Sequence, residues 1–102
     1  MLKSLDAKRA EIAALCRRFH VRRLEVFGSA ASGGFDPARS DVDFLVEFDG
    51  DPRALSLATY FGLKEALEAL LGRPVDLVEA NAVDNPYLRA SIERARQPLF
   101  AA

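Results

Sequence analysis

The sequence predicts a small α/β (α+β) domain in which helices flank a mixed β-sheet of about three to four strands. Three short apolar runs, at residues 23–27, 42–48 and 74–79, contain the β-branched and aromatic residues that are typical of strands. Segments with apolar residues three and four positions apart precede, separate and follow these runs, as expected of amphipathic helices. The helix between the second and third runs favours parallel pairing of those two strands. The linker between the first and second runs also permits antiparallel pairing.

The first helix is expected over residues 4–19, and Ser4 is a plausible N-cap. Its apolar stripe, which should face the core, consists of Ile12, Leu15, Cys16 and Phe19. After the first strand, the small residues of 28–34 form a turn that can begin a short helix. The Asp and Pro content of residues 35–40 predicts a loop.

The second half of the chain carries clear start and stop signals for helices. Asp51 is predicted to cap a helix that begins at Pro52 and ends before Gly72. Asn85 and Pro86 begin the last helix in the same way, and Pro98 should end or kink it. In the second strand, Val42, Phe44, Val46 and Phe48 alternate onto one face, which we expect to be the core face.

Length and composition predict a single cytoplasmic domain covering residues 1–102. The chain has 102 residues, half of them apolar and 28% charged, as in soluble globular proteins. Its apolar runs are far shorter than a membrane span, so no membrane association is expected. The start of the chain has no apolar signal region, and one cysteine, Cys16, cannot form an internal disulfide. A domain of this size has a thin core, which leaves a homo- or hetero-oligomer open.

The net charge of −1 hides an uneven distribution. The first 23 residues are basic on balance and the remainder is acidic. The basic segment is either a solvated helix face or a surface that meets phosphates or an acidic partner. The acidity of the remaining chain argues against a broad nucleic-acid footprint, so nucleic acid is an unlikely partner.

Three acidic residues, Asp41, Asp43 and Asp76, interrupt the apolar runs. Asp41 and Asp43 should project from the same face of the second strand, with their Cα atoms about 6–7 Å apart. If the second and third strands are neighbours, Asp76 joins them in a carboxylate triad. Such oxygen ligands suit Mg²⁺, and two ions would stabilise the attacking and leaving oxygens of a phosphoryl displacement. The alternative for Asp41 and Asp43 is a strand edge that faces water, and for Asp76 an exposed strand residue.

A Gly28-Ser29 turn directly follows the first strand. Glycine lets the backbone approach a phosphate closely, and Ser29 with the free N–H groups behind it could hold the phosphates of a nucleotide. An ordinary tight turn is the alternative for this pair alone. The order of strand, Gly-Ser, Asp-x-Asp on a strand, helix and Asp on a strand indicates nucleotidyl transfer.

In this combination of motifs the chain resembles the minimal nucleotidyltransferases of the DNA polymerase beta-like nucleotidyltransferase superfamily. The matching motifs are Val26 to Ser29, Ser40 to Val46, Val75 to Val78 and the last helix from Asn85. The resemblance implies the polymerase beta-like nucleotidyltransferase fold. It also implies ATP as substrate and two Mg²⁺ ions as cofactors.

By the same resemblance, each motif residue has a role. Gly28, Ser29 and Ser40 would bind the nucleotide. Asp41, Asp43 and Asp76 would be the metal ligands and catalytic residues, and Asp76 could instead act as general base on the attacking hydroxyl.

Small proteins of this family pair with HEPN-domain ribonuclease toxins, and the resemblance implies a similar partner here. The chain would then be the antitoxin of a type VII-like toxin–antitoxin pair and would transfer AMP from ATP to a tyrosine of the toxin. One alternative is a non-catalytic antitoxin that neutralises its partner by complex formation. Ala31 and Ser32, which replace an arginine that many relatives carry in this loop, favour that alternative. The other is a nucleotidyltransferase acting on a small molecule or an RNA end.

Overall fold

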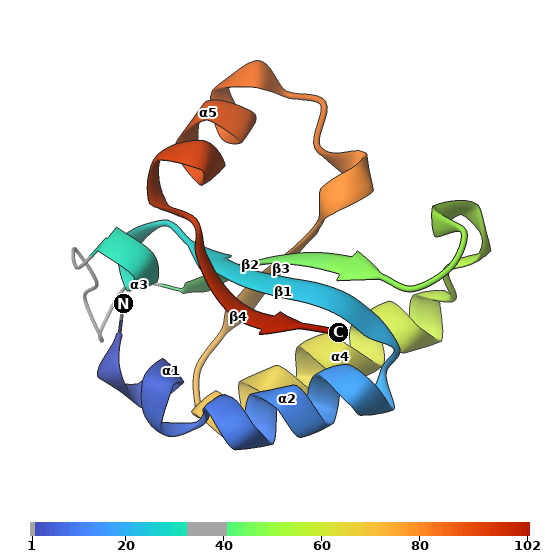
Figure 1. Cartoon of the computed structure of the whole chain (residues 1–102), viewed down its shortest axis with the longest axis horizontal. Helices are drawn as coiled ribbons and strands as arrows, with labels where there is room; N and C mark the ends of the chain where they lie inside the picture. Colours follow the sequence, from blue (N-terminus) through green and yellow to red (C-terminus); the bar gives the residue numbers. More distant parts are fainter. Residues whose placement is uncertain (1, 33–40) are drawn as a thin grey trace.

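The computed structural model describes residues 2–32 and 41–102, which form helices around a single four-stranded sheet (Figure 1). The elements follow in the order α1 (Lys3–Ala7), α2 (Arg9–Arg18), β1 (Val21–Phe27), α3 (Ser29–Ser32), β2 (Val42–Phe48), the 3₁₀ turn η1 (Pro52–Ala54), α4 (Leu57–Leu71), β3 (Val75–Glu79), the 3₁₀ turn η2 (Ala80–Ala82), α5 (Pro86–Ala95) and β4 (Gln97–Ala101). The predicted loop at 35–40 lies outside the described residues. Within the described part of the chain, no helix has the length and apolar character needed to cross a membrane.

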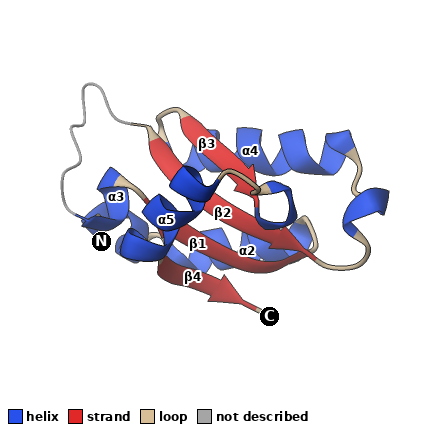
Figure 2. Cartoon of the chain, turned by 90° about the horizontal axis from the view of Figure 1, so that it is seen from above, coloured by secondary structure: helices blue, strands red, loops and turns tan. Residues whose placement is uncertain are grey.

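The sheet is mixed, with the strand order β3-β2-β1-β4 that Figure 2 shows from above. β2 and β3 are parallel neighbours joined by α4, as the sequence predicts. β1 is antiparallel to both of its neighbours, β2 and β4. The predicted fold class, a small mixed sheet flanked by helices, is therefore confirmed.

β4 is the one strand without a predicted run of its own. The last helix ends at Ala95, as Pro98 suggests, but the chain then continues as an edge strand in which Pro98 pairs with Glu25. Proline is tolerated in this position because an edge strand has one side without ladder hydrogen bonds.

α2 and α4 cover one face of the sheet and enclose the main core (Figure 1). The predicted core residues of β2 point to this side, and Val42, Phe44 and Val46 are fully buried. The other large, fully buried side chains of this core are Leu5, Ile12, Cys16, Val21, Leu24, Val26, Leu63 and Leu67. Burial raises the pKa of the Cys16 thiol to about 12, so this cysteine is a core residue and not a reactive thiol.

α5 and η2 cover the opposite face only in part. The apolar cluster on this side has three buried members, Phe27, Leu45 and Ile92. A partly buried ion pair joins the end of α5 to the same face: the Arg96 guanidinium donates to both carboxylate oxygens of Glu25, at 2.5 and 2.9 Å. Glu25 is 7% exposed, so the pair lies between the helix end and the sheet.

The first predicted helix is divided in two at Lys8. Lys8 leaves helical geometry (φ −108°, ψ 17°), and its Nζ donates to the carbonyl of Leu70 at 2.9 Å. Ser4 lies inside α1, which starts after Leu2, so the predicted Ser4 cap is wrong. The turn at Lys8 lets α1 place the fully buried Leu5 in the core.

The predicted Asp51 cap of the long helix is also wrong. Asp51 caps only η1, by accepting a hydrogen bond from the Arg53 N–H at 2.9 Å. The chain then extends through Leu55, which packs against the main core, and Ser56 caps α4 by accepting from the Ala58 N–H. The stop at Gly72 and the Asn85 cap of α5 are confirmed.

Candidate active site

Asp43 and Asp76 are direct partners in the parallel register of β2 and β3. Val42 pairs with Val75 on one side of this pair and Phe44 with Leu77 on the other. Because side chains alternate along a strand, Asp43 and Asp76 leave the sheet on the face opposite the main core. The backbone thus brings together two of the three predicted acidic residues.

Asp41 precedes β2 by one residue and is exposed, as is Asp76. Asp43 is half-buried. Burial, together with the negative charges of Asp76 and Asp41, raises the pKa of Asp43 to about 6. Asp41 and Asp76 therefore both lie near enough to the Asp43 carboxylate for their charges to act on it.

Gly28 lies against the Asp43 carboxylate. Its φ of +70° is in the left-handed region, and a Cβ at this position would overlap Asp43 Oδ2 and lie 3.3 Å from Asp43 Cγ. Phe27 pairs with Asp43 across β1 and β2, which sets this approach. A glycine is thus required here by both backbone conformation and space.

Ser29 begins the one-turn helix α3 directly after Gly28. The Ala31 N–H donates to the Gly28 carbonyl at 3.2 Å, and the Leu2 N–H donates to the Ala30 carbonyl at 2.8 Å. These bonds hold the start of the predicted phosphate-binding turn beside the acidic residues. Ser40, the third predicted nucleotide-binding residue, lies outside the described residues.

The donor chemistry of this cluster fits Mg²⁺, which in proteins is commonly held by one or two carboxylates together with substrate phosphates. Asp43 and Asp76 supply such a pair from adjacent strands. Over residues 2–32 and 41–102, no three histidine, cysteine or acidic side chains converge into a site ready to hold a metal ion. In the described part of the chain, the carboxylates thus do not form a closed three-carboxylate site.

Two side chains of α4, which no sequence motif indicates, contact β3 on either side of Asp76. Glu68 accepts a hydrogen bond from the Val75 N–H at 3.0 Å, and the Tyr60 hydroxyl donates to the Leu77 carbonyl. Both residues belong to the helix that the sequence predicts between Pro52 and Gly72. Their eight-residue spacing places both on one helix face, but sequence alone does not show which backbone groups they meet.

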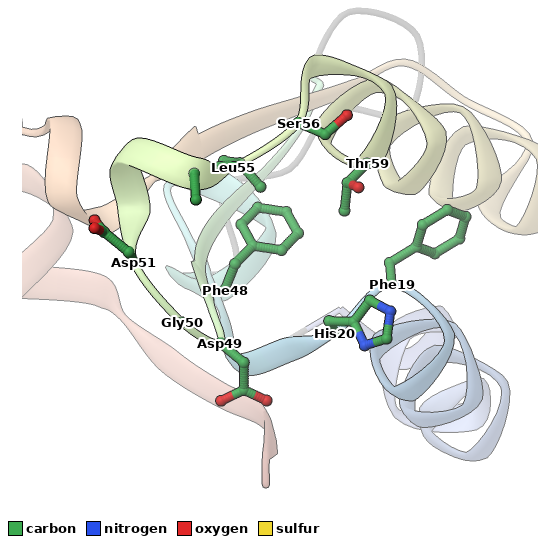
Figure 3. A pocket seen from close by; sticks show the side chains of 10 residues that line it. Phe19, His20, Phe48, Asp49, Gly50, Asp51, Leu55, Ser56 and Thr59 are labelled. Carbon is green, nitrogen blue, oxygen red and sulfur yellow. The ribbon is translucent and has the colours of Figure 1, made fainter.

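A cavity of about 260 Å³ lies at the other end of β2, roughly 17 Å along the strand from Asp43. Figure 3 shows Phe48 and Leu55 on one side of it and Phe19 and His20 on another, while the carboxylates of Asp49 and Asp51 point away from its centre. Those two acidic residues are paired with Arg22 and Arg53. This cavity is separate from the carboxylate cluster.

A second cavity of about 270 Å³ opens on the same sheet face as Asp43. Leu45, two residues along β2 from Asp43, forms part of its wall. The remaining lining residues come from η2, α5 and their surroundings: Ala80, Val83, Arg89, Ile92, Glu93 and Arg96. The partly covered face therefore combines the acidic residues with open space.

Residues 10–99 match the family model described as the nucleotidyltransferase domain. The protein adenylyltransferase MntA of Thermococcus cleftensis is 50% identical over 64 residues, which are 63% of this chain and 61% of that protein. The matched residues 10–99 include β1, β2 and β3 with all of the predicted acidic residues.

Two solved structures have the same arrangement of elements. A structure provisionally assigned as a minimal nucleotidyltransferase superposes with a TM-score of 0.76 at 38% identity, over 97% of each chain. A chain in the structure of a tri-AMPylated HEPN toxin from Shewanella oneidensis with an MNT antitoxin gives a TM-score of 0.68 at 19% identity. That match covers 96% of this chain and 73% of the other, and at this identity it concerns the fold alone.

Proposed function

This chain belongs to the nucleotidyltransferase domain family, and we propose that it transfers AMP from ATP to a tyrosine hydroxyl of a HEPN-domain ribonuclease toxin. In this proposal it is the antitoxin of a type VII-like pair. The observation that carries the proposal is the register of Asp43 with Asp76, with Gly28 packed against Asp43. The name of the Thermococcus relative and the AMPylated toxin in the Shewanella structure support the acceptor class.

The nucleotide would bind where β1 ends. Gly28 allows close approach of the chain, and Ser29 begins α3 beside it. Ser40, which directly precedes the Asp-x-Asp motif in the sequence, would add a further phosphate contact. Because the acidic residues repel the triphosphate, binding of ATP here requires a cation between them.

Asp41, Asp43 and Asp76 are the residues that would hold Mg²⁺. When bound, one or two Mg²⁺ ions would stabilise the charge on the attacking and leaving oxygens. The mutual repulsion that raises the Asp43 pKa is the electrostatic situation that a divalent cation relieves.

In its alternative role as general base, Asp76 would receive the proton of the acceptor hydroxyl. It is exposed on the edge strand of the sheet, so a hydroxyl of a second protein can approach it. The tyrosine oxygen forms a bond to the α-phosphorus of ATP, the bond from that phosphorus to pyrophosphate breaks, and the tyrosine proton passes to the Asp76 carboxylate. AMP then remains on the toxin and pyrophosphate leaves.

The test is the intact mass of a HEPN-domain toxin after incubation with this protein, ATP and Mg²⁺. We expect the mass to rise by one or more AMP units and fragmentation to place them on tyrosine. Asp43→Asn should remove the adduct. The matched control is Asp49→Asn, which makes the same change at the far end of β2 and should leave the adduct in place.

Equal labelling by the wild type and Asp43→Asn would contradict the assigned site. A toxin that is neutralised without any adduct, by wild type and Asp43→Asn alike, would instead establish an antitoxin that acts by complex formation. Omission of Mg²⁺ with EDTA tests the metal requirement in the same assay.

A further inference from the structure

The outer edge of β3 is closed on both sides of Asp76 by side chains of α4. Glu68 Oε2 accepts the Val75 N–H at 3.0 Å, and the Tyr60 hydroxyl donates to the Leu77 carbonyl. β3 is the last strand on its side of the sheet, so the backbone groups of Val75 and Leu77 that point away from β2 have no strand to pair with. The two side chains take the place of that missing strand.

Along β3, successive residues direct their backbone N–H and C=O groups alternately toward β2 and away from it. The Val42 N–H donates to the Pro74 carbonyl at 3.2 Å, so residues 74 and 76 direct their backbone groups toward β2. Residues 75 and 77 direct theirs outward, where Glu68 and Tyr60 meet them. Asp76 is therefore held from the sheet side by its own backbone and from the helix side through both of its neighbours.

Tyr60 and Glu68 are eight residues apart on α4, with Lys64 between them on the same helix face. Lys64 Nζ lies 3.5 Å from Glu68 Oε2 and supports the carboxylate. The hydrogen bond from Val75 keeps the pKa of Glu68 below its usual value, so the acceptor is fully ionised near neutral pH. Tyr60 is half-buried, and the nearby charge of Asp76 adds to the effect of burial in raising its pKa.

We propose that Tyr60 and Glu68 are positioning residues that hold Asp76 in register with Asp43. The inference rests on the proposed function, because it concerns the carboxylate assigned to receive the acceptor proton. Asp43 lies on an inner strand that is paired on both sides, whereas Asp76 lies on an edge strand paired on one side. A slip of β3 by one residue would turn Asp76 to the opposite face of the sheet.

The experiment uses single substitutions in the whole chain, measured well below its unfolding temperature. Tyr60→Phe removes only the hydroxyl, and Glu68→Met removes the acceptor at similar length. Glu68→Gln keeps an oxygen that can accept the Val75 N–H and serves as the rescue variant. Matched controls are Tyr87→Phe and Glu65→Met, which make the same changes at exposed positions.

We expect Tyr60→Phe and Glu68→Met to lower kcat for AMP transfer about tenfold or more. The KM for ATP should stay within twofold, because the predicted phosphate-binding residues, Gly28, Ser29 and Ser40, are not on β3. Hydrogen exchange of the Val75 amide, followed by NMR, should accelerate about tenfold in Glu68→Met. Glu68→Gln and both controls should stay within twofold of the wild type in every measurement.

Unchanged kcat in Tyr60→Phe and Glu68→Met would overturn the proposal, as would an unchanged Val75 amide. If the wild type transfers no AMP to any HEPN toxin, the proposed function fails, and Mn²⁺ affinity measured by electron paramagnetic resonance replaces kcat. The positioning role then requires severalfold weaker Mn²⁺ binding in Glu68→Met than in Glu68→Gln. Equal affinities, or no Mn²⁺ binding by the wild type, would overturn it.

Discussion

The two faces of the sheet differ in what their residues do. The face under α2 and α4 is closed by a continuous apolar core, in which ten or more side chains are fully buried. The face under α5 has three buried apolar residues, an ion pair between Glu25 and Arg96, and a cluster of acidic side chains at one end. One face gains free energy from burial, and the other holds charges that oppose folding.

The difference indicates that one face of the sheet stabilises the fold and the other carries the candidate site. Apolar burial on the first face offsets the repulsion that Asp76 and Asp41 exert on Asp43 on the second. β2 belongs to both regions at once, since its alternate residues enter the core and the candidate site. Substitutions on the two faces should consequently affect different measurements.

The largest expected effect is the loss of AMP transfer in Asp43→Asn. Removal of this charge takes away a proposed metal ligand while its shape is kept, and we expect a decrease in kcat/KM of about a thousandfold, or about 4 kcal/mol of transition-state stabilisation. The measurement is the initial rate of AMP incorporation into the toxin. A decrease of less than tenfold, in a variant that remains folded by circular dichroism, would place the reaction elsewhere.

The opposite result is expected for Leu67→Ala on the first face. Leu67 is fully buried in the main core, so its truncation should lower the free energy of unfolding by about 3 kcal/mol. Transfer below the unfolding temperature should remain within threefold of the wild type. Ile92→Ala on the second face should lower the free energy of unfolding by less, since its apolar cluster is small. An equal or larger decrease, measured by urea unfolding, would show that the two faces do not differ in their contribution to stability.

Gly28→Ala tests the contact between the glycine turn and the acidic cluster. The left-handed φ alone costs about 1 kcal/mol for alanine, and the overlap with the Asp43 carboxylate should raise the total loss of stability to about 2 kcal/mol. Transfer should decrease at least tenfold as Asp43 moves. Gly72→Ala is the matched control, because Gly72 has nearly the same φ, +68°, and open space around it.

If Gly28→Ala and Gly72→Ala lose equal stability, the contact with Asp43 contributes nothing. If Gly28→Ala keeps wild-type transfer, the turn is not part of the site. Chemical denaturation and the AMP-incorporation assay separate these two results.

The main strands and the parallel pair were predictable because local patterns determine them. Alternating apolar residues in β2 and β-branched residues in β3 indicate strands, and a helix between them indicates parallel pairing. β4 was missed because the pairing of residues 97–101 with β1 depends on tertiary contacts, and Pro98 is a weak strand former. The breaks at Lys8 and before Ser56 follow from contacts with Leu70 and the core, which no local pattern records.

The candidate site was predictable as a set of residues and less so as an arrangement. The sequence places Asp41, Asp43 and Asp76 on strands, and the register then aligns Asp43 with Asp76. The close approach of the Gly28 backbone to the Asp43 carboxylate was not predictable, since it depends on the register between β1 and β2. The contacts of Tyr60 and Glu68 depend on the rotation of α4 over the sheet edge, so periodicity alone does not reveal them.

The smallest effect that we predict is a gain in stability from the same substitution that removes activity. The pKa of Asp43 in the folded chain is about 6, above its usual value, so at pH 8 the ionised carboxylate is less favourable in the folded than in the unfolded state. Asp43→Asn should therefore raise the free energy of unfolding at pH 8 in EDTA by about 1 kcal/mol, after allowance for partial exposure of the side chain. At pH 4 the carboxyl is protonated in the folded chain and a little under half protonated in the unfolded chain, so the gain should be much smaller than at pH 8. Urea unfolding at both pH values measures the difference, and a variant less stable than the wild type at pH 8 would show that the acidic cluster contributes to the fold instead of straining it.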